Sequence, residues 1–431
     1  MIIHGPDNAD YDEDLGPVML TDYYHDDYFS ILKDVMGTDL TKIAPSSQNN
    51  LINGKGNYNC SLVTDDTTCT ENAGLAKFEF TSGQTHRLRL INGGAEAIQR
   101  FSIDDHVMEV IAYDFVPIVP YTTNQVTLAV GQRADVLVKA NASASGSYWM
   151  RSSISTLCSV TDNPDALAII YYENANTTAQ PTSTSWTIDD SNCANDDLSK
   201  TVPFFPIKPP AVNTTVEVAL SFELNSTGNF LWTMDASSFR TDYNNPILPL
   251  LQADNSTANI KEFPSEWNVY NFGSNKSFVI VINNENAVAH PMHIHGHNMF
   301  VLSDGLGTWD GTTQGSSSNP TRRDVQLLQP DGYIAIQIDA DNPGVWPFHC
   351  HIAWHVSGGL YINILERPAD IPSMVKTPSE VDALCTSWEA YTARQAPDQI
   401  DSGLRKRSQS PEVKRRQHLK NHRAGNVRHN L

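Results

Sequence analysis

The chain has 431 residues and carries 29 Lys and Arg against 49 Asp and Glu, a net charge of −20 that argues against nucleic acid as a partner. Hydrophobic residues make up 40% of the chain, enough to bury a sizeable core, which excludes global disorder. No apolar run approaches the ~18 residues of a membrane span, so no membrane partner is expected, and the length allows two or three domains.

The beginning of the chain gives conflicting signals about its compartment. Residues 1–16 contain neither the basic nor the long apolar region of a signal peptide, and residues 1–5 are typical of the end of a β-strand with no sheet before it. Seven Asn-x-Ser/Thr sites nevertheless favour a secreted glycoprotein. They are Asn59, Asn141, Asn176, Asn213, Asn225, Asn255 and Asn275. We therefore expect that the start of the protein is missing.

Four of the six cysteines suggest two local disulfides. Cys60 and Cys69 lie close together in a polar, turn-rich stretch. Cys158 and Cys193 flank a segment rich in Ser, Thr and Asn, which a bridge would close. Because spacing alone does not fix the connectivity of six cysteines, both pairs are hypotheses.

Short apolar segments bounded by Gly, Pro, Asn and Asp predict β-strands along most of the chain. Only the stretch from Pro378 to about Arg394 clearly predicts a helix. The pattern therefore favours an all-β protein. The clearest strand segments are residues 87–91, 135–138, 277–282 and 333–338.

An internal repeat organises these strands. Residues 87–92 (RLRLIN) match residues 278–283 (FVIVIN) at an offset of 191, and the same offset places His106 opposite His297. This similarity indicates that one β-domain occurs twice.

The repeat continues downstream, where residues 130–150 resemble residues 330–350 at offsets of about 200. We expect the two copies to be joined by the Ser/Thr/Pro-rich segment from about Asn174 to Pro210. The second copy carries a cluster of histidines and a cysteine that the first lacks, so we expect the chemistry there.

Seven of the 14 histidines fall in two short motifs of the second copy. Residues i and i+2 of a strand share a face, so the two His-x-His pairs, 293–295 and 349–351, each direct two imidazoles at one site. Cys350 then points to the opposite face, and one strand serves two metal sites. The motifs are His290-Pro-Met-His293-Ile-His295-Gly-His297 and His349-Cys350-His351-Ile-Ala-Trp354-His355.

These ligand types select a transition metal. Two imidazoles and one thiolate with a weak or absent axial ligand form the blue-copper electron-transfer site, and His290, Cys350 and His355 fit this set. A structural zinc site would normally use more thiolates in a Cys-x₂₋₄-Cys spacing, which the chain lacks. Ordinary structural roles are expected for His4, His25, His86, His106 and His297.

With these motifs the sequence resembles the multicopper oxidases, and most closely the ascomycete-type laccases, over about residues 1–404. The segments HPMHIHGHNMF and HCHIAWHVSGGL resemble the two C-terminal copper motifs of that family. The resemblance implies an all-β fold of tandem cupredoxin-like Greek-key β-sandwich domains with a few short helices. It divides the chain into the family's second domain without copper ligands (1–180), a linker (181–210), the copper-binding third domain (211–404) and a basic tail (405–431).

The resemblance also assigns ligands residue by residue. His290, Cys350 and His355 correspond to the type 1 copper ligands. Leu360 falls at the axial position, where a non-coordinating residue raises the potential relative to Met. His293 corresponds to a type 2 copper ligand, and the type 3 ligands correspond to His295, His349 and His351.

The substrate pocket of such enzymes lies beside the type 1 histidine, His355. Glu96 matches the acidic residue that accepts a phenolic proton or holds an amine, which avoids a high-energy radical cation as the electron leaves. From spacing alone, a solvated loop carboxylate is the simpler interpretation of Glu96. Pocket-wall positions, which core packing would equally explain, match Phe230, Trp232, Val288 and Trp354.

The resemblance implies an enzyme that removes single electrons from phenols or aryl amines at the type 1 copper and reduces O₂ to water at a trinuclear cluster. The complete enzyme of this family holds four coppers and is secreted. We expect it to be a monomer whose partners are a phenolic small molecule and O₂.

The sequence departs from this family in one large respect. The cluster needs eight histidines, four of them from two His-x-His motifs of an N-terminal domain, and here such pairs occur only in the two motifs above. Cys385 corresponds to a cysteine that pairs with that domain, so it is left without a partner. We therefore expect a truncated chain that binds about one copper.

We weigh two other functions, the first from this departure and the second, a ferroxidase, from the same copper motifs. The chain as it stands is a mononuclear copper-binding or inactive protein if the missing ligands are not supplied. A ferroxidase would need several acidic iron ligands near His355, and Glu96 is the only candidate.

The last segment, residues 405–431, differs in charge from the rest. It contains nine Lys and Arg and one acid, so it carries +8 while residues 1–404 carry −28. Such a tail can bind nucleic acid or a membrane surface, but it is more often disordered or removed by processing. Residues 401–404 resemble the C-terminal plug of these laccases, after which a basic propeptide is removed.

Overall fold

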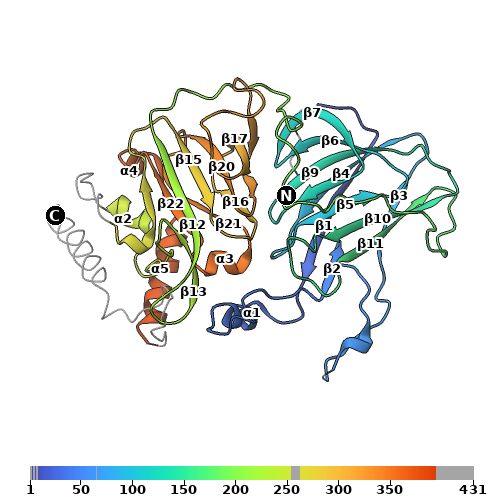
Figure 1. Ribbon diagram of the computed structural model, residues 1–431, viewed down its shortest axis with the longest axis horizontal. Helices are drawn as coiled ribbons and strands as arrows, with labels where there is room; N and C mark the ends of the chain where they lie inside the picture. Colours follow the sequence, from blue (N-terminus) through green and yellow to red (C-terminus); the bar gives the residue numbers. More distant parts are fainter. Residues whose placement is uncertain (1, 3–4, 6–7, 65, 254–262, 395–431) are drawn as a thin grey trace.

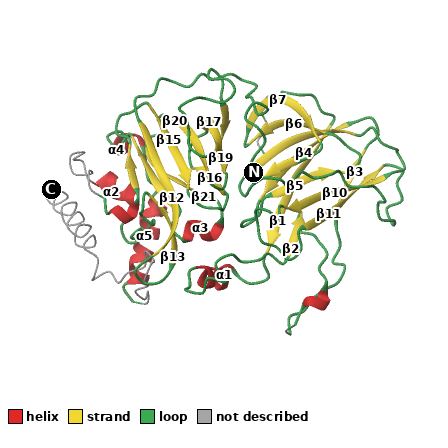
Figure 2. Ribbon diagram, in the orientation of Figure 1, coloured by secondary structure: helices red, strands yellow, loops and turns green. Residues whose placement is uncertain are grey.

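The computed structural model describes residues 2, 5, 8–64, 66–253 and 263–394. Within these residues, two β-sandwiches lie side by side, which we call the N-terminal sandwich (β1–β11) and the C-terminal sandwich (β12–β22) (Figure 1). The described helices are short and lie around the sandwiches (Figure 2). The prediction of an all-β chain with two tandem copies of one domain is confirmed.

The N-terminal sandwich packs a sheet of order β2-β1-β4-β9-β6-β7 against a sheet of order β3-β11-β10-β5-β8. Alternate side chains of each strand enter the core between the sheets, where Phe80, Leu88 and Phe101 are among the fully buried residues. The strands are β1 Glu13–Tyr23, β2 Asn49–Ile52, β3 Ala76–Phe80, β4 Thr85–Asn92, β5 Gln99–Ile103, β6 Met108–Tyr113, β7 Val116–Thr123, β8 Val126–Leu128, β9 Arg133–Lys139, β10 Ser147–Ile154 and β11 Asp165–Tyr172.

The C-terminal sandwich repeats this topology, with the orders β13-β12-β15-β20-β17-β18 and β14-β22-β21-β16-β19. Its core includes Cys350 among buried apolar side chains. The strands are β12 Thr215–Leu224, β13 Phe230–Met234, β14 Val269–Asn271, β15 Ser277–Asn284, β16 His290–Ile294, β17 Met299–Leu306, β18 Thr321–Arg323, β19 Val325–Leu328, β20 Gly332–Asp339, β21 Gly344–Cys350 and β22 Tyr361–Glu366.

The predicted helix at 378–394 is confirmed as α5, Ser379–Thr392. Four shorter helices also occur among the described residues, as the resemblance implied, although sequence pattern alone did not locate them. Each has eight residues or fewer, too few for a 3.6-residue apolar period to stand out. These helices are α1 Tyr28–Val35, α2 Ile247–Ala253, α3 Ala353–Ser357 and α4 Ile371–Met374, with single 3₁₀ turns at Cys60–Leu62 and Ser265–Trp267.

The repeat is confirmed in topology, but its register needs one correction. In the ladder with β9, Leu88 lies opposite Val136, and in the equivalent ladder with β20, Ile280 lies opposite Ile336. Leu88 is therefore equivalent to Ile280, at an offset of 192 rather than 191. The offset of 191 aligns Leu88, which faces the core, with Val279, which faces outward. Such an error matters because a shift of one residue exchanges the two faces of a strand.

The equivalence of His106 and His297 is confirmed. Each follows one of the equivalent strands β5 and β16 and precedes a strand, β6 or β17, that is interrupted by a register shift at the same place. His106 is hydrogen-bonded to Tyr172, and His297 forms an ion pair with Glu366, so both have the structural roles expected of them.

Both predicted disulfides, Cys60–Cys69 and Cys158–Cys193, are present. Cys385 is a free, partly exposed cysteine. Six of the seven predicted glycosylation sites lie at exposed or partly exposed positions, and Asn255 lies outside the described residues. So do residues 1 and 3–4 of the predicted first strand, the plug at 401–404 and the basic tail. None of the helices in the described ranges is long and apolar enough to cross a membrane.

Candidate metal centre

Three ligand side chains converge in the core of the C-terminal sandwich. His290 begins β16, Cys350 ends β21, and His355 lies in α3 directly after that strand. Cys350 Sγ lies 3.6 Å from the Nδ1 atoms of both histidines, and the two Nδ1 atoms are 3.2 Å apart. A triangle of this size leaves room for one ion about 2 Å from each donor atom, a normal metal–ligand distance. The three residues therefore fit a copper ion.

Burial prepares these donors for a cation. His290 and Cys350 are fully buried, and burial lowers the pKa of His290 to about 3 and the pKa of His355 well below its usual value. Both imidazoles are thus neutral and have lone pairs to offer. Burial raises the pKa of the Cys350 thiol, so its thiolate needs a bound cation for charge balance.

The surroundings of this trio are apolar. Leu360 is fully buried, and its backbone carbonyl accepts the N–H of Cys350 at 3.2 Å. The Trp232 ring lies 4.6 Å from the ring of His290 and 4.4 Å from that of His355. A dry, hydrophobic shell of this kind raises the reduction potential of a copper site.

A second group of imidazoles lies on the opposite face of β16 and β21. His293 and His349 are register partners in that ladder, and Nε2 of His349 is 3.0 Å from Nε2 of His295. The ligand atoms of these three residues lie within 4.8 Å of one another. His351 completes the group, with its ring 5.5 Å from that of His293. As the two-residue period predicts, Cys350 points away from its two histidine neighbours.

Backbone carbonyls orient two of these imidazoles. His293 Nδ1 lies 2.7 Å from the carbonyl of Asp324, and His349 Nδ1 lies 2.7 Å from the carbonyl of Cys350. Because a carbonyl only accepts, each Nδ1 carries the proton and each Nε2 lone pair remains free for a metal. Burial lowers the pKa of both rings to about 4, which keeps them neutral.

A cavity of about 650 Å³ opens beside the Cys350 trio. His355 lines it, so the cavity reaches one of the three proposed ligands directly. The other side chains predicted for the pocket also line it and come from both sandwiches: Glu96, Phe230, Trp232, Val288 and Trp354.

Glu96 is held against α3. Its carboxylate accepts a 2.9 Å hydrogen bond from the indole Nε1–H of Trp354, the residue before His355. Burial, helped by the charge of Asp22, raises the pKa of Glu96 to about 8. The carboxyl group is therefore a stronger base than an exposed glutamate. The interpretation of Glu96 as a solvated loop carboxylate is not supported.

Sequence reasoning missed two features of this cavity. Asp22 on β1 accepts the backbone N–H groups of residues 95, 96 and 97 and so fixes the turn that carries Glu96. The α1 segment leaves the N-terminal sandwich and reaches the C-terminal core with Ile31, while Val35 and Met36 line the cavity. The only local signal was the Asp27 cap, since these contacts join residues far apart in sequence.

The chain was compared with known proteins. Two family models, both described as multicopper oxidase, match residues 14–175 and 240–370. Laccase-1 of Botryotinia fuckeliana is 35% identical over 412 residues, which cover 94% of this chain and 68% of the relative. The laccase of Neurospora crassa is 34% identical and covers 96% and 67%. The chain thus spans about two thirds of the length of these relatives.

Solved structures agree with this relationship. The crystal structure of the laccase from Botrytis aclada matches with a TM-score of 0.81 at 35% identity, covering 94% of this chain and 73% of that one. Fet3p, described as a multicopper oxidase that functions in iron import, matches with a TM-score of 0.77 at 23% identity and shows the same fold. The cupredoxin-like architecture is confirmed, and the chain belongs to the multicopper oxidase family.

Proposed function

We propose that this chain is the substrate-oxidising part of a laccase-like oxidase that removes one electron at a time from phenols or aryl amines. The observation that carries the proposal is the position of the His290–Cys350–His355 trio, which borders the cavity that also contains Glu96. Copper bound by the trio would accept single electrons from a molecule in this cavity. In this proposal residues 1–180 are the family's second domain, 181–210 a linker and 211–404 its third domain.

The protein's own residues have separable tasks in this reaction. His355 lies in the cavity wall and would give an electron the shortest route to the trio. Glu96 would accept the phenolic proton as the electron leaves, since its raised pKa makes it an effective base. Trp354 would hold Glu96 by its indole N–H and form part of the apolar wall with Phe230 and Val288.

The electron would then move from Cys350 to His349 or His351, each one residue away along β21. We propose that these two histidines, with His293 and His295, contribute half of a trinuclear copper cluster that reduces O₂ to water. The type 2 role of His293 and the type 3 roles of the other three are part of this proposal.

A second candidate function is a mononuclear copper protein that does not reduce O₂. It is favoured by the second imidazole group, because four imidazoles provide only half of the ligands that such a cluster uses in this family. Copper counted per purified chain separates the two: about one supports the second candidate, and about four supports the first. Among the described residues that line the cavity, Glu96 is the only carboxylate, so a ferroxidase gains no support.

Oxygen uptake with a phenolic substrate tests the proposal. A version in which all eight cluster histidines are present, supplied with copper, should consume O₂, and Cys350→Ser in it should abolish both this uptake and the blue copper–thiolate absorption. Uptake that persists in Cys350→Ser would refute a role for the trio.

The pH dependence tests the role of Glu96. The base must be deprotonated, so phenol oxidation should rise with pH up to about 8, where the pKa of Glu96 lies. Glu96→Gln should lower the rate about 10²-fold or more and flatten this rise. Glu96→Asp, which keeps the carboxylate, is the matched control. An unchanged pH profile in Glu96→Gln would remove Glu96 from the mechanism.

We further propose that the protein is secreted and glycosylated at its exposed Asn-x-Ser/Thr sites. Asn59, Asn141, Asn176 and Asn213 are exposed, and two disulfides are formed, as is usual in an oxidising compartment. Removal of N-linked glycans from the secreted protein should lower its mass. A protein recovered only inside the cell, at its unmodified mass, contradicts this proposal.

A further inference from the structure

A turn of the N-terminal sandwich, residues 131–133 at the start of β9, reaches across to the second imidazole group. From its contacts we propose that Arg133 is a positioning residue for His293: it holds Asp324, whose carbonyl fixes the orientation of the imidazole. The sandwich that supplies none of the four histidines would then set the geometry of their metal site. This inference rests on the proposed function in one respect, namely that the imidazole group binds copper.

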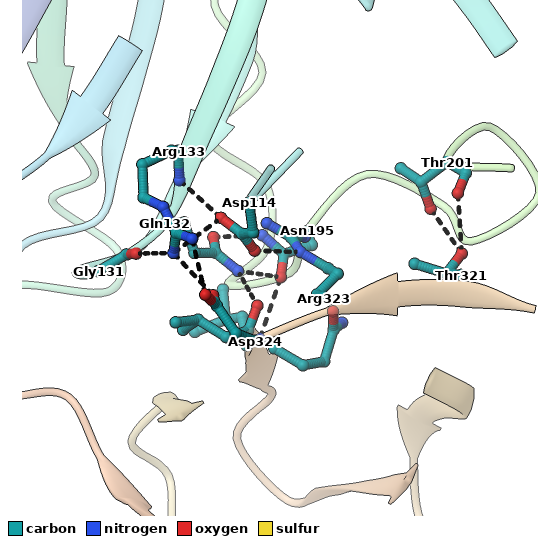
Figure 3. A network of polar contacts seen from close by, with 12 residues as sticks. Asp114, Gly131, Gln132, Arg133, Asn195, Thr201, Thr321, Arg323 and Asp324 are labelled. Atoms are coloured by element: carbon teal, nitrogen blue, oxygen red, sulfur yellow. Dashed lines mark hydrogen bonds and ion pairs between the residues drawn. The ribbon is translucent and has the colours of Figure 1, made fainter. Parts of the chain in front are cut away.

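The first link is a two-pronged ion pair between the sandwiches. Nη1 and Nη2 of Arg133 donate to Oδ1 and Oδ2 of Asp324, both at 2.7 Å (Figure 3). Nη1 also donates to the carbonyl of Gly131 at 2.8 Å, and the ring of Phe115 covers the guanidinium at 4.8 Å. Because the planar fork is held on several sides, it fixes the carboxylate in direction as well as in distance.

The second link runs through the backbone of Asp324, which lies between β18 and β19. Its carbonyl accepts Nδ1–H of His293 at 2.7 Å and the backbone N–H of Ile294 at 3.1 Å. The ion pair therefore holds the side chain of the same residue whose carbonyl selects the His293 tautomer. With the proton on Nδ1, the Nε2 lone pair is directed away from β19 and remains free for a metal.

The third link is direct packing of the same turn on His351. Gly131 has a φ of +83°, and a Cβ atom placed there would lie 2.4 Å from Cδ2 of the His351 ring, so the imidazole rests on the glycine backbone. Between the two contacts, the side-chain amide of Gln132 donates to the carbonyl of Val325 at 3.0 Å. Residues 131–133 thus make consecutive contacts: the first with His351, the second with Val325 and the third with Asp324, whose carbonyl orients His293.

One other contact of β18 provides a contrast. Arg323 pairs with Asp114 at 2.8 Å, but Asp114 also accepts the backbone N–H of Arg133, so this pair belongs to the same network. Thr201, in the segment between the sandwiches, is hydrogen-bonded to Thr321 of β18 at 2.8 Å (Figure 3). In the described part of the chain, the hydrogen bonds of the Thr201 hydroxyl go to residues other than the four histidines. Thr201→Val therefore weakens the attachment of β18 to the rest of the chain without touching the links above, and it is the matched control.

The experiment uses the full chain in three variants: Arg133→Gln, Arg133→Lys and Thr201→Val. In metal-free protein labelled with ¹⁵N-histidine, long-range ¹H–¹⁵N spectra report which ring nitrogen of His293 carries the proton, with the signal assigned by its loss in His293→Gln. We expect the Nδ1–H form in the unmodified chain, a mixture of tautomers in Arg133→Gln, partial recovery in Arg133→Lys and no change in Thr201→Val.

Copper titration against a chelator provides the second readout. Arg133→Gln should weaken copper binding at the second imidazole group about 10- to 100-fold, the usual effect of removing an outer-shell partner. The blue absorption of copper at Cys350 should be unchanged, which also shows that the variant is folded. If Arg133→Gln does not fold, Arg133→Lys against Thr201→Val makes the same comparison.

Three results would overturn the inference: an Nε2–H form of His293 in the unmodified chain, an unchanged tautomer in Arg133→Gln, or an equal change in Thr201→Val. The last would mean that any loosening of β18 has the same effect. The proposed function fails separately, by an absence of O₂ uptake in the version that holds all eight cluster histidines. The tautomer readout needs neither copper nor turnover, so the two failures are distinguishable.

Discussion

The two sandwiches have the same strand order, yet among the described residues only the C-terminal one holds a candidate set of metal ligands in its core. Gln99 pairs with Leu128 in the first sandwich as His290 pairs with Leu328 in the second, so these two residues are equivalent. By the same ladders Ser152 is equivalent to Cys350. In the C-terminal sandwich the thiol and the imidazole at these positions face each other. In the N-terminal sandwich the equivalent side chains form hydrogen bonds within the protein: Ser152 Oγ donates to Gln99 at 2.7 Å, and Gln99 donates to Asn50 at 2.9 Å.

This difference shows how little of a shared scaffold must change to create a metal site. A buried polar group needs a partner, and at these two positions the first sandwich provides one within the protein. In the second, the Nδ1 atoms of His290 and His355 and the Sγ atom of Cys350 face one another. Their lone pairs are therefore available to an ion.

The largest effect is expected from giving the second sandwich the residues of the first. In His290→Gln with Cys350→Ser, blue absorption and O₂ uptake should fall below detection, because two of three ligands are lost. The metal-free double variant should keep its cooperative unfolding, since Gln99 and Ser152 show that the scaffold accepts this pair. Loss of folding in the double variant would show that the two cores differ by more than these residues.

The two equivalent histidines beside the cores should differ in their contribution to stability. His297→Gln removes the imidazole that lies 2.8 Å from the fully buried Glu366, and at a pH where His297 is protonated it should lower the free energy of unfolding by about 3–5 kcal/mol. His106→Gln removes hydrogen bonds to two neutral groups, the Asp104 carbonyl and the Tyr172 hydroxyl, and should cost about 1–2 kcal/mol. Urea unfolding of both metal-free variants makes the comparison, and equal losses would contradict it.

Apolar replacement at the two equivalent core positions tests the contrast between satisfied and unsatisfied groups. Gln99→Leu breaks the network with Asn50 and Ser152 and should cost about 2 kcal/mol. His290→Leu in metal-free protein should cost less than about 1 kcal/mol, because it removes a buried ring nitrogen that has no partner. Urea midpoints with an unchanged slope are the measurement, and a reversed order would overturn the comparison.

The smallest effect concerns Asp304 on β17, which stands where the first sandwich has Tyr113. Burial raises the pKa of Asp304 to about 6 in the folded chain. Between about pH 4 and 6 the folded state therefore keeps a proton that the unfolded state releases, so stability falls as pH rises. Asp304→Asn should reduce this fall by about 1 kcal/mol between pH 4 and 7.

The control for this last prediction is the equivalent position in the other sandwich. Tyr113→Phe should leave the stability change between pH 4 and 7 as it is, because burial raises the pKa of Tyr113 far above this range. A pH profile that is identical in Asp304→Asn and the unmodified chain would show that Asp304 is not protonated in the folded state.

The sequence by itself determined the features that depend on neighbours in the chain. The two-residue period of a strand was enough to place His349 and His351 on one face and Cys350 on the other. Local spacing was also enough for both disulfides, helix α5 and the strands around Leu88 and Ile336.

Only the tertiary structure decided how the two copies correspond and what surrounds the site. The two copies differ in loop length, so the number of residues that separates equivalent positions changes along the chain: it is 192 at β4, 191 at β6 and 200 at β9. An alignment of the copies at a single separation therefore misplaces some strands by one residue. Asp22, Arg133 and α1 could not be assigned from sequence, because their partners lie elsewhere in the chain. Arg133 and Asp324 are 191 residues apart, and only the packing of the two sandwiches joins them.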